Sequence, residues 1–428
     1  MGDIRLPRGV RDFMPNEALF RNQVIEKIED AFQLYGFVNI ETPKIEPLGL
    51  LKAKSGLGDE NKLIFEIAEE NIGLRYDMTM SLARYIVMHQ DIPMPFKRYA
   101  IGNVWRMDEP QRLRYREFTQ ADIDIIGGNE AAANAEVISA ACTAYAKLDV
   151  APKISISSRK IVEGAMRAFG VPKEKMIGCM RILDKLDKIG SDGVRGMLDE
   201  YAGPDISGKL VEMLDFGDTN EEKIRYATGI AGEDATKEIR DTLALLDTYS
   251  SKEAVEIDFS VIRGLDYYTG IVMEARMYSA SGKFDVLGGG GRYSDLVKNL
   301  GGRELGGVGV ALGVDRILET LDISKRTKKS IAEVFVSNVK SNNFRYALGV
   351  ANRLRNESIP TDMNIAERNI SNQMSYAANM GYRYVVIVGD NEEKKNMPKV
   401  RDMSSGDEVQ VSADELAKWI TDKQKSTN

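Results

Sequence analysis

Three segments of the sequence combine arginines, carboxylates and glycines, the residue types that handle phosphate. In the first segment, 96–127, a strand-like run carries Arg106 into a polar loop, and a second run carries Gln120, Asp122 and Asp124. Because side chains alternate along a strand, the last three share one face of it. Charged groups inside a sheet are costly unless they face a ligand or each other. The segment is therefore either part of a binding site or a hairpin closed by a surface salt bridge.

The second segment, 261–275, places Arg263 before a glycine and the adjacent tyrosines Tyr267 and Tyr268. Neighbouring side chains on a strand point to opposite faces, so at most one of these tyrosines can line a given pocket. A β-hairpin with aromatic residues in the core is the alternative interpretation.

The third segment, 287–317, is dense in glycine and ends with Arg316. Glycine lets the backbone approach a ligand at distances where any Cβ would clash. The spacing matches neither the Gly-x-x-x-x-Gly-Lys-Ser/Thr phosphate loop nor the Gly-x-Gly-x-x-Gly dinucleotide motif. Without other observations, such glycine density is typical of turns.

The histidine and cysteine content excludes several kinds of site. His89 is the single histidine, and Cys142 and Cys179 are the two cysteines, so neither a multi-histidine metal site nor a cysteine-rich zinc site can form. His89 itself lies in an apolar-rich helical stretch, where a structural role is usual. Catalysis must therefore depend on arginines, carboxylates, glycines and tyrosines, with or without a bound cation. The net charge of −7 argues against a generally basic nucleic-acid-binding surface, but allows a local basic groove.

The length of 428 residues predicts two or three domains. Short strand-like runs between 61 and 126 alternate with a helix near 79–90, which favours a largely antiparallel sheet. No apolar run is long enough to span a bilayer, and the charged N-terminus is unlike a signal peptide, so we expect a cytoplasmic protein. The predicted organisation is an α+β unit over 1–323, a helical insertion within it at about 159–250, a polar linker at 324–330 and an α/β unit over 331–428.

Together these segments resemble the class II aminoacyl-tRNA synthetases. Arg106 is similar to the arginine of motif 2, the Gly-Val-Gly-Val-Ala-Leu-Gly-Val-Asp-Arg stretch ending at Arg316 resembles motif 3, and Pro43 resembles the motif 1 proline at the dimer interface. The peptides Arg-Gly-Leu-Asp-Tyr-Tyr-Thr (263–269) and Gly-Gly-Arg-Tyr (290–293) narrow the resemblance to the histidyl-tRNA synthetases. Residues 8–12 resemble that family's N-terminus, and 331–428 resemble its anticodon-binding domain.

The resemblance implies a fold and a reaction. The fold would be an antiparallel catalytic sheet flanked by helices, followed by an α/β anticodon-binding domain. The reaction would join L-histidine to ATP, carried with Mg²⁺, to give histidyl-adenylate and pyrophosphate, and would then transfer histidine to the 3′ end of tRNA(His). The family is homodimeric, and here neither zinc nor a metal held by protein ligands alone is expected. Because the attacking carboxylate is already a nucleophile, the reaction needs charge stabilisation rather than a general base.

The resemblance also assigns site residues. Arg106, Arg263 and Arg316 would be catalytic. Asp77, Thr79 and Gln120 would hold the ammonium group of histidine, while Asp124 and Tyr268 would hold the imidazole nitrogens. The complete expected sets are, for histidine, Asp77, Thr79, Arg106, Gln120, Asp124, Arg263, Tyr267 and Tyr268, and for ATP, Arg106, Asp108, Arg114 and Arg316.

The sequence departs from the common family pattern in one peptide. Tyr76-Asp77-Met78-Thr79 stands where Pro-Glu-Gly-Thr is usual, so a shorter carboxylate would make the contact to the ammonium group. This shorter acid and the peptide 119–124 resemble the eukaryotic and archaeal type of the family.

Two alternatives remain open from the sequence. One is a non-catalytic paralogue that regulates histidine biosynthesis; such proteins usually lose the signature residues and the anticodon domain, and both are present here. The other is a class II synthetase for threonine, proline or glycine, which would not be expected to carry the Arg-Gly-Leu-Asp-Tyr-Tyr peptide.

Overall fold

The computed structural model describes residues 4–53, 63–263, 268–279, 283–321, 329–366 and 368–425. The chain divides into two compact units, one formed by Met1–Arg11 with Val24–Leu321 and the other by Asp12–Gln23 with Asp322–Asn428. Most of the predicted linker, 324–330, lies outside the described residues. The finer division into a core, an insertion and a linker stays a prediction.

The first unit is built on a sheet of eight strands, counted over the described residues, in the order β1-β5-β6-β11-β10-β9-β7-β8. Each neighbouring pair between β5 and β7 is antiparallel, whereas β1 lies parallel to β5 and β8 lies parallel to β7. The predicted fold, a largely antiparallel sheet flanked by helices, is confirmed. The strands are β1 (Val38–Asn39), β5 (Phe96–Trp105), β6 (Glu117–Ile126), β7 (Lys153–Ser158), β8 (Val255–Ile257), β9 (Ile271–Tyr278), β10 (Phe284–Tyr293) and β11 (Gly307–Gly313).

Helices pack their apolar side chains against this sheet. α4 (Glu130–Lys147) contacts β6 and β11, and its first turn is capped by Asn129, whose side chain accepts a hydrogen bond from Ala132 N. α12 (Val314–Thr320) packs on β6, β10 and β11. The first unit also contains the part of α1 (Pro15–Leu34) from Val24 onward. Its remaining elements are α2 (Leu48–Ala53), α3 (Thr79–Met88) and α11 (Leu296–Asn299), with a small sheet of β2 (Ile45–Pro47), β4 (Ile72–Leu74) and β3 (Glu66–Ile67).

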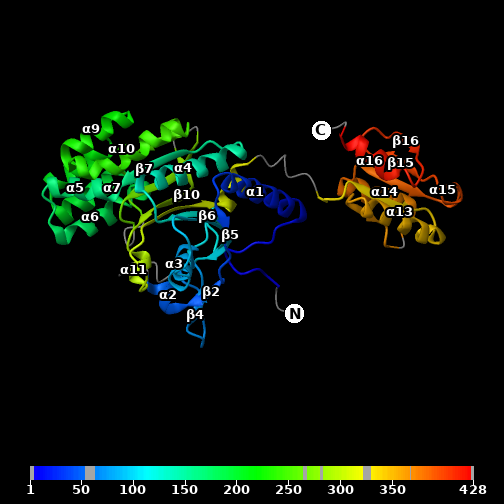
Figure 1. The fold of residues 1–428 in the computed structure, drawn as a ribbon, viewed down its shortest axis with the longest axis horizontal. Helices are drawn as coiled ribbons and strands as arrows, with labels where there is room; N and C mark the ends of the chain where they lie inside the picture. Colours follow the sequence, from blue (N-terminus) through cyan, green and yellow to red (C-terminus); the bar gives the residue numbers. More distant parts are fainter. Residues whose placement is uncertain are drawn as a thin grey trace. The chain divides into compact units, whose positions relative to one another are not determined.

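The stretch predicted as a helical insertion is helical throughout its described elements. They are α5 (Arg159–Ala168), a 3₁₀ turn (Lys173–Lys175), α6 (Met176–Leu183), α7 (Leu186–Ala202), α8 (Pro204–Leu214), α9 (Asn220–Ala231) and α10 (Glu233–Thr248), followed by a second 3₁₀ turn (Lys252–Ala254). In Figure 1 these helices gather at one end of the unit. Parts of α5, α6, α7 and α8 share a core of their own, whereas α10 packs on α4 and β7. The last helix of the stretch is thus joined to the main sheet.

The second unit contains a five-stranded sheet in the order β13-β12-β14-β15-β16. One apolar cluster joins it to α13 and α16, and a second joins it to α14, so helices cover both faces of the sheet. The continuous apolar run Tyr384–Val388 predicts a strand that is buried on both faces in this way. The elements are β12 (Val334–Asn338), a 3₁₀ turn (Ser341–Asn343), α13 (Phe344–Asn356), β13 (Thr361–Met363), α14 (Ile370–Met380), β14 (Tyr384–Val388), α15 (Asp390–Lys395), β15 (Lys399–Asp402), β16 (Glu408–Gln410) and α16 (Leu416–Lys425).

Candidate active site

A cavity of about 240 Å³ lies in the first unit, lined by residues of β6, β10 and β11 and of the segments that lead into and out of them. Residues that are distant in the sequence meet there. The cavity is lined by ten of the predicted site residues: Asp77, Thr79, Arg106, Asp108, Arg114, Gln120, Asp124, Arg263, Tyr268 and Arg316. Tyr267 lies outside the described residues. The structure therefore brings the described candidates into one place, while the role of each remains a prediction.

The acidic side of this cavity is formed by β6. Gln120, Asp122 and Asp124 are all buried and all line it, so the alternation of the strand places them as predicted. The Asp124 carboxylate forms an ion pair with Arg98 Nη2 at 2.6 Å and accepts a hydrogen bond of 2.6 Å from the Tyr293 hydroxyl. Arg98 stands opposite Asp124 in the β5–β6 pairing. The hairpin charges thus lie at a cavity rather than on an exposed surface.

Four arginines lie close enough around the cavity to affect one another. Burial lowers the pKa of the Arg316 guanidinium, and the positive charges of Arg263, Arg106 and Arg114 lower it further. Arg316 is held by two backbone carbonyl groups, through Nε to Leu113 O at 3.2 Å and through Nη1 to Val286 O at 2.5 Å. Mutually repelling cations fixed by the backbone favour the binding of a polyanion such as a triphosphate.

Arg106 and Arg263 are each oriented by a local partner. Arg106 Nε donates a hydrogen bond to Tyr76 O at 3.0 Å, and its guanidinium lies 5.1 Å from the centre of the Phe118 ring. Arg263 Nη1 forms an ion pair of 2.9 Å with Glu274 Oε1. Both groups therefore have a defined place in the protein without substrate.

The loop between β5 and β6 contains the other two predicted ATP residues. Arg114 Nε donates to Asp108 Oδ2 at 3.1 Å, so these two side chains hold each other. Arg11 tethers the same region, because it donates to Tyr115 Oη at 3.0 Å and to Asp315 Oδ1 at 2.6 Å. The N-terminal peptide 8–12 thus supports the cavity, although none of its residues is among the predicted site residues.

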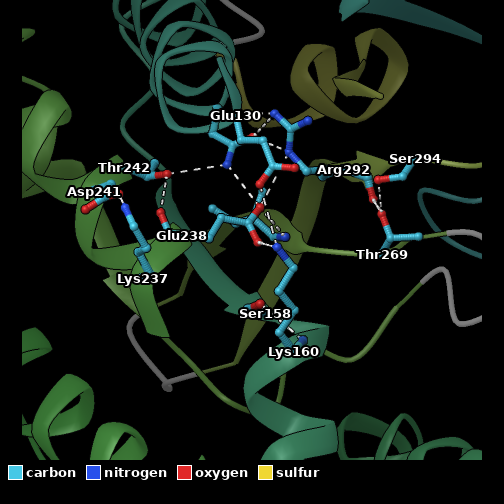
Figure 2. Close-up of polar contacts among 12 residues, drawn as sticks. Glu130, Ser158, Lys160, Lys237, Glu238, Asp241, Thr242, Thr269, Arg292 and Ser294 are labelled. Carbon is cyan, nitrogen blue, oxygen red and sulfur yellow. Dashed lines mark hydrogen bonds and ion pairs between the residues drawn. The ribbon is translucent and has the colours of Figure 1, made fainter. Parts of the chain in front are cut away.

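The peptide Gly-Gly-Arg-Tyr (290–293), the second of the two that indicate the family, has side chains on both faces of the sheet. Tyr293 lines the cavity, whereas Arg292 points to the opposite side, where it contacts Asn134. Glu238 lies beside it there (Figure 2). Arg292 Nη2 donates to Asn134 Oδ1 at 2.9 Å, and its Nε lies 3.5 Å from Glu238 Oε1. Glu238 also accepts a hydrogen bond from Ile271 N at 3.0 Å and pairs with Lys160 at 3.2 Å.

The buried cluster of Asn134, Glu238 and Arg292 fixes the end of the peptide 263–269. Thr269 N donates to Arg292 O at 2.8 Å, and the hydroxyl groups of Thr269 and Ser294 lie 2.8 Å apart. Figure 2 labels Thr269 and Ser294 beside Arg292. Glu238 binds the backbone two residues further on, at Ile271. Helix α10 therefore helps to hold the strand start that follows Tyr268.

Glu238→Gln is expected to lower the free energy of unfolding by about 3 kcal/mol, since it leaves the buried Arg292 without its carboxylate partner. Glutamine keeps an oxygen that can accept from Ile271 N, so the loss reports mainly on the charge. Asp241→Asn on the same helix is the matched control, because Asp241 and Lys237 form an exposed pair and should cost less than about 1 kcal/mol. Equal losses for the two variants in urea unfolding would contradict this prediction.

Sequence reasoning did not assign several residues that shape the site. Asp122 lies on the predicted face but has no predicted role. Arg11 and Asp315 belong to peptides that resemble the family but also have no predicted role, and the sequence does not single out Arg98 and Glu238. Strand alternation and the presence of an arginine in the preceding strand could have indicated Arg98. No short-range signal pointed to Glu238, because its partners lie far along the chain.

Asp122→Asn is expected to flatten the dependence of stability on pH in the ligand-free protein. Burial raises the pKa of Asp122 from 3.8 to about 7, against the opposing charge of Arg98. The folded protein therefore binds this proton more tightly than the unfolded chain, and the free energy of unfolding falls as pH rises from about 4 to about 7, by at most about 1.4 kcal/mol per pH unit. Urea unfolding should show the variant gaining stability over the original protein between pH 5 and pH 8. Parallel pH profiles would contradict this.

Comparisons with known proteins agree with the geometry. A family model described as histidyl-tRNA synthetase matches residues 9–317, and one described as an anticodon binding domain matches residues 333–423. The histidine–tRNA ligase of Korarchaeum cryptofilum is 36% identical over 98% of this chain and 99% of that protein. The crystal structure of histidyl-tRNA synthetase from Nostoc sp. PCC 7120 superposes with a TM-score of 0.83 at 26% identity, covering 98% of this chain and 99% of that one.

A further solved structure bears on the regulatory alternative. It is described as an ATP phosphoribosyltransferase regulatory subunit/histidyl-tRNA synthetase from Bacillus halodurans C, and it has a TM-score of 0.77 at 21% identity, covering 90% of this chain and 98% of that one. At that identity the likeness shows the fold alone. The family model and the full-length relative, in contrast, match both the signature-bearing unit and the C-terminal unit, and they show that this chain belongs to the histidyl-tRNA synthetase family.

Proposed function

We propose that the chain is a class II histidine–tRNA ligase, which forms histidyl-adenylate from L-histidine and ATP–Mg²⁺ and transfers histidine to the 3′ end of tRNA(His). The observation that carries this proposal is one cavity in which Arg106, Arg263 and Arg316 meet the acceptors of β6. Such a cavity offers cationic groups to a triphosphate and anionic groups to a cationic amino acid. Family membership supports the same reaction.

Adenylation in this cavity requires positioning and charge stabilisation. A histidine carboxylate oxygen forms a bond to the α-phosphorus of ATP, and the bond to the bridging oxygen breaks, so that pyrophosphate leaves with the electron pair. The proposed role of Arg106 is to bind the α-phosphate and the substrate carboxylate, while Arg263 stabilises the charge that develops in the transition state. Arg316, with Asp108 and Arg114, is proposed to hold the rest of ATP, and Mg²⁺ arrives bound to its phosphates.

Selection of histidine is proposed to depend on the imidazole ring. Asp124 and Tyr268 would bind the two ring nitrogens, and Asp77, Thr79 and Gln120 would bind the ammonium group; Tyr267 is proposed from the signature peptide alone. A buried acceptor that needs a ring N–H is left unpaired by other side chains, which penalises them strongly. The ion pair with Arg98 and the hydrogen bond from the Tyr293 hydroxyl fix the position of the Asp124 carboxylate, which would orient it toward the ring.

Other properties of the protein are proposed from the resemblance. They are a homodimeric state, a cytoplasmic location, an anticodon-binding role for 331–428 and an absence of zinc. Within the described part of the chain, helices long and apolar enough to cross a membrane are lacking, and side chains that could together hold a metal ion do not form a group of three or more.

ATP–pyrophosphate exchange with each of the twenty amino acids tests the proposed function. Exchange that depends on histidine alone is expected, followed by charging of tRNA(His). Exchange with another amino acid would indicate a different synthetase, and a folded protein without exchange would favour the regulatory paralogue.

A further inference from the structure

Two acceptors on the cavity face of β6 lack hydrogen-bond partners among the described residues. They are Gln120 Oε1 and Asp122 Oδ1, and both atoms are buried. Two neighbouring carboxylates that also line the cavity differ in this respect. Asp77 Oδ1 accepts from Met80 N at 3.1 Å, and Asp124 is held by Arg98 and Tyr293. Buried acceptors are nearly always paired, so the pair on β6 indicates a ligand that brings donors.

The spacing of these acceptors suits a compact donor. Residues two apart on a strand lie about 7 Å from each other and point to the same side. A donor group placed between the two side chains could therefore donate a hydrogen bond to each of them. The residues that flank Asp122 on the neighbouring strands are Ala100 and Ala311, whose small side chains leave space beside its carboxylate.

The surrounding charges favour a cation. Asp77, Asp122 and Asp124 interact with the charges of two buried or half-buried arginines, Arg75 and Arg98. When these five groups are ionised, one negative charge remains; Arg106, whose charge also acts on Asp122, is left out of this count because it is proposed to bind the substrate carboxylate and the α-phosphate. One bound positive charge would balance it, and a group with several N–H bonds would also satisfy the acceptors.

We propose that Asp122 is a substrate-binding residue that, together with Gln120, accepts hydrogen bonds from the ammonium group of the amino acid. This inference rests on the proposed function and adds a residue to its ammonium site. The ammonium group has three donors and one charge, which match the two unpaired acceptors and the residual negative charge. Asp77, whose Oδ1 already binds the start of α3, is then left to help position that helix as well as the substrate.

The test compares two inhibitors of histidine-dependent pyrophosphate exchange by the full chain. Histidinol keeps the ammonium group and the ring, whereas 3-(imidazol-4-yl)propionic acid keeps the ring and the carboxylate but has no ammonium group. In Asp122→Asn the inhibition constant of histidinol should rise about 10–100-fold, as expected for a lost hydrogen bond to a charged group. The ratio of the propionic acid's constant to that of histidinol should fall by at least about 10-fold, and the KM for ATP should stay within about twofold.

Two further variants separate binding from folding. Gln120→Leu should lower the same ratio by a smaller factor, because it removes a neutral acceptor. Glu46→Gln breaks a buried pair with Arg84 outside the cavity, and should lower the melting temperature while leaving the ratio unchanged.

An unchanged ratio in a folded Asp122→Asn variant would overturn the proposal, as would equal weakening of both inhibitors. Exchange that does not depend on histidine in the original protein would overturn the proposed function instead. The two failures are therefore distinguishable.

Discussion

Arg263→Ala is expected to lower the rate of histidine adenylation by about 10²–10³-fold, the usual effect of removing one preorganised group that stabilises transition-state charge. Arg263 lines the cavity, and its charge is close enough to lower the pKa of the Arg316 guanidinium. In the proposed reaction, alanine at 263 would remove a cation from the place where charge develops on the α-phosphate. Pyrophosphate exchange at saturating histidine and ATP measures the effect.

The fold is expected to survive this change. The ion-pair partner of Arg263 is Glu274, which keeps a second partner in Arg276 Nε at 3.0 Å, so no buried carboxylate is left unpaired. Arg303→Ala is the control, because Arg303 lies outside the residues that line the cavity and contacts Gln90 O. Near-normal exchange by Arg263→Ala would show that the stabilising charge lies elsewhere.

Local patterns in the sequence were sufficient to predict a largely antiparallel sheet and the residues that share the cavity face of β6. Alternation alone places Gln120, Asp122 and Asp124 on one side, and all three line the cavity. The continuous apolar run Tyr384–Val388 indicates a strand covered on both faces, which two separate clusters confirm. These features depend on the alternation of side chains along a strand and on runs of apolar residues, and both patterns are visible within a few positions of the sequence.

Pairings set by register or by distant contacts could not be read in the same way. Asp124 meets Arg98 only because β5 and β6 pair at one particular register across a long loop. The residue pattern around Glu238 predicts only charged, amphipathic helices. In the structure its side chain nevertheless binds Ile271 N and pairs with Arg292. The sequence also does not predict β15 and β16, because these strands are short and partly polar. Such contacts require the tertiary arrangement before any side chain can be assigned a partner.

Gly289→Ala is expected to lower adenylation nearly as far as Arg263→Ala, by about 10²-fold, while the protein remains folded. A Cβ at Gly289 would stand 1.9 Å from Arg263 Nη1 and 2.7 Å from its Cζ, whereas the nearest backbone atom, Met273 O, would lie 3.0 Å away and need shift only slightly. The end of a long side chain can move away, so the clash displaces the guanidinium from the cavity rather than opening the sheet. Pyrophosphate exchange and a melting curve for the same preparation measure the two effects separately.

The neighbouring glycine provides the matched contrast, because its surroundings cannot move. A Cβ at Gly290 would stand 1.9 Å from the backbone oxygen of Gly309, directly within the β10–β11 pairing, so Gly290→Ala should lose folding rather than activity alone. In the double variant Gly289→Ala/Arg263→Ala the rate should be close to that of Arg263→Ala, since the severe clash of the added methyl group is with the guanidinium and its contact with Met273 O is milder. A further loss in the double variant would mean that Gly289 serves the substrate directly, by allowing the backbone of β10 to approach it.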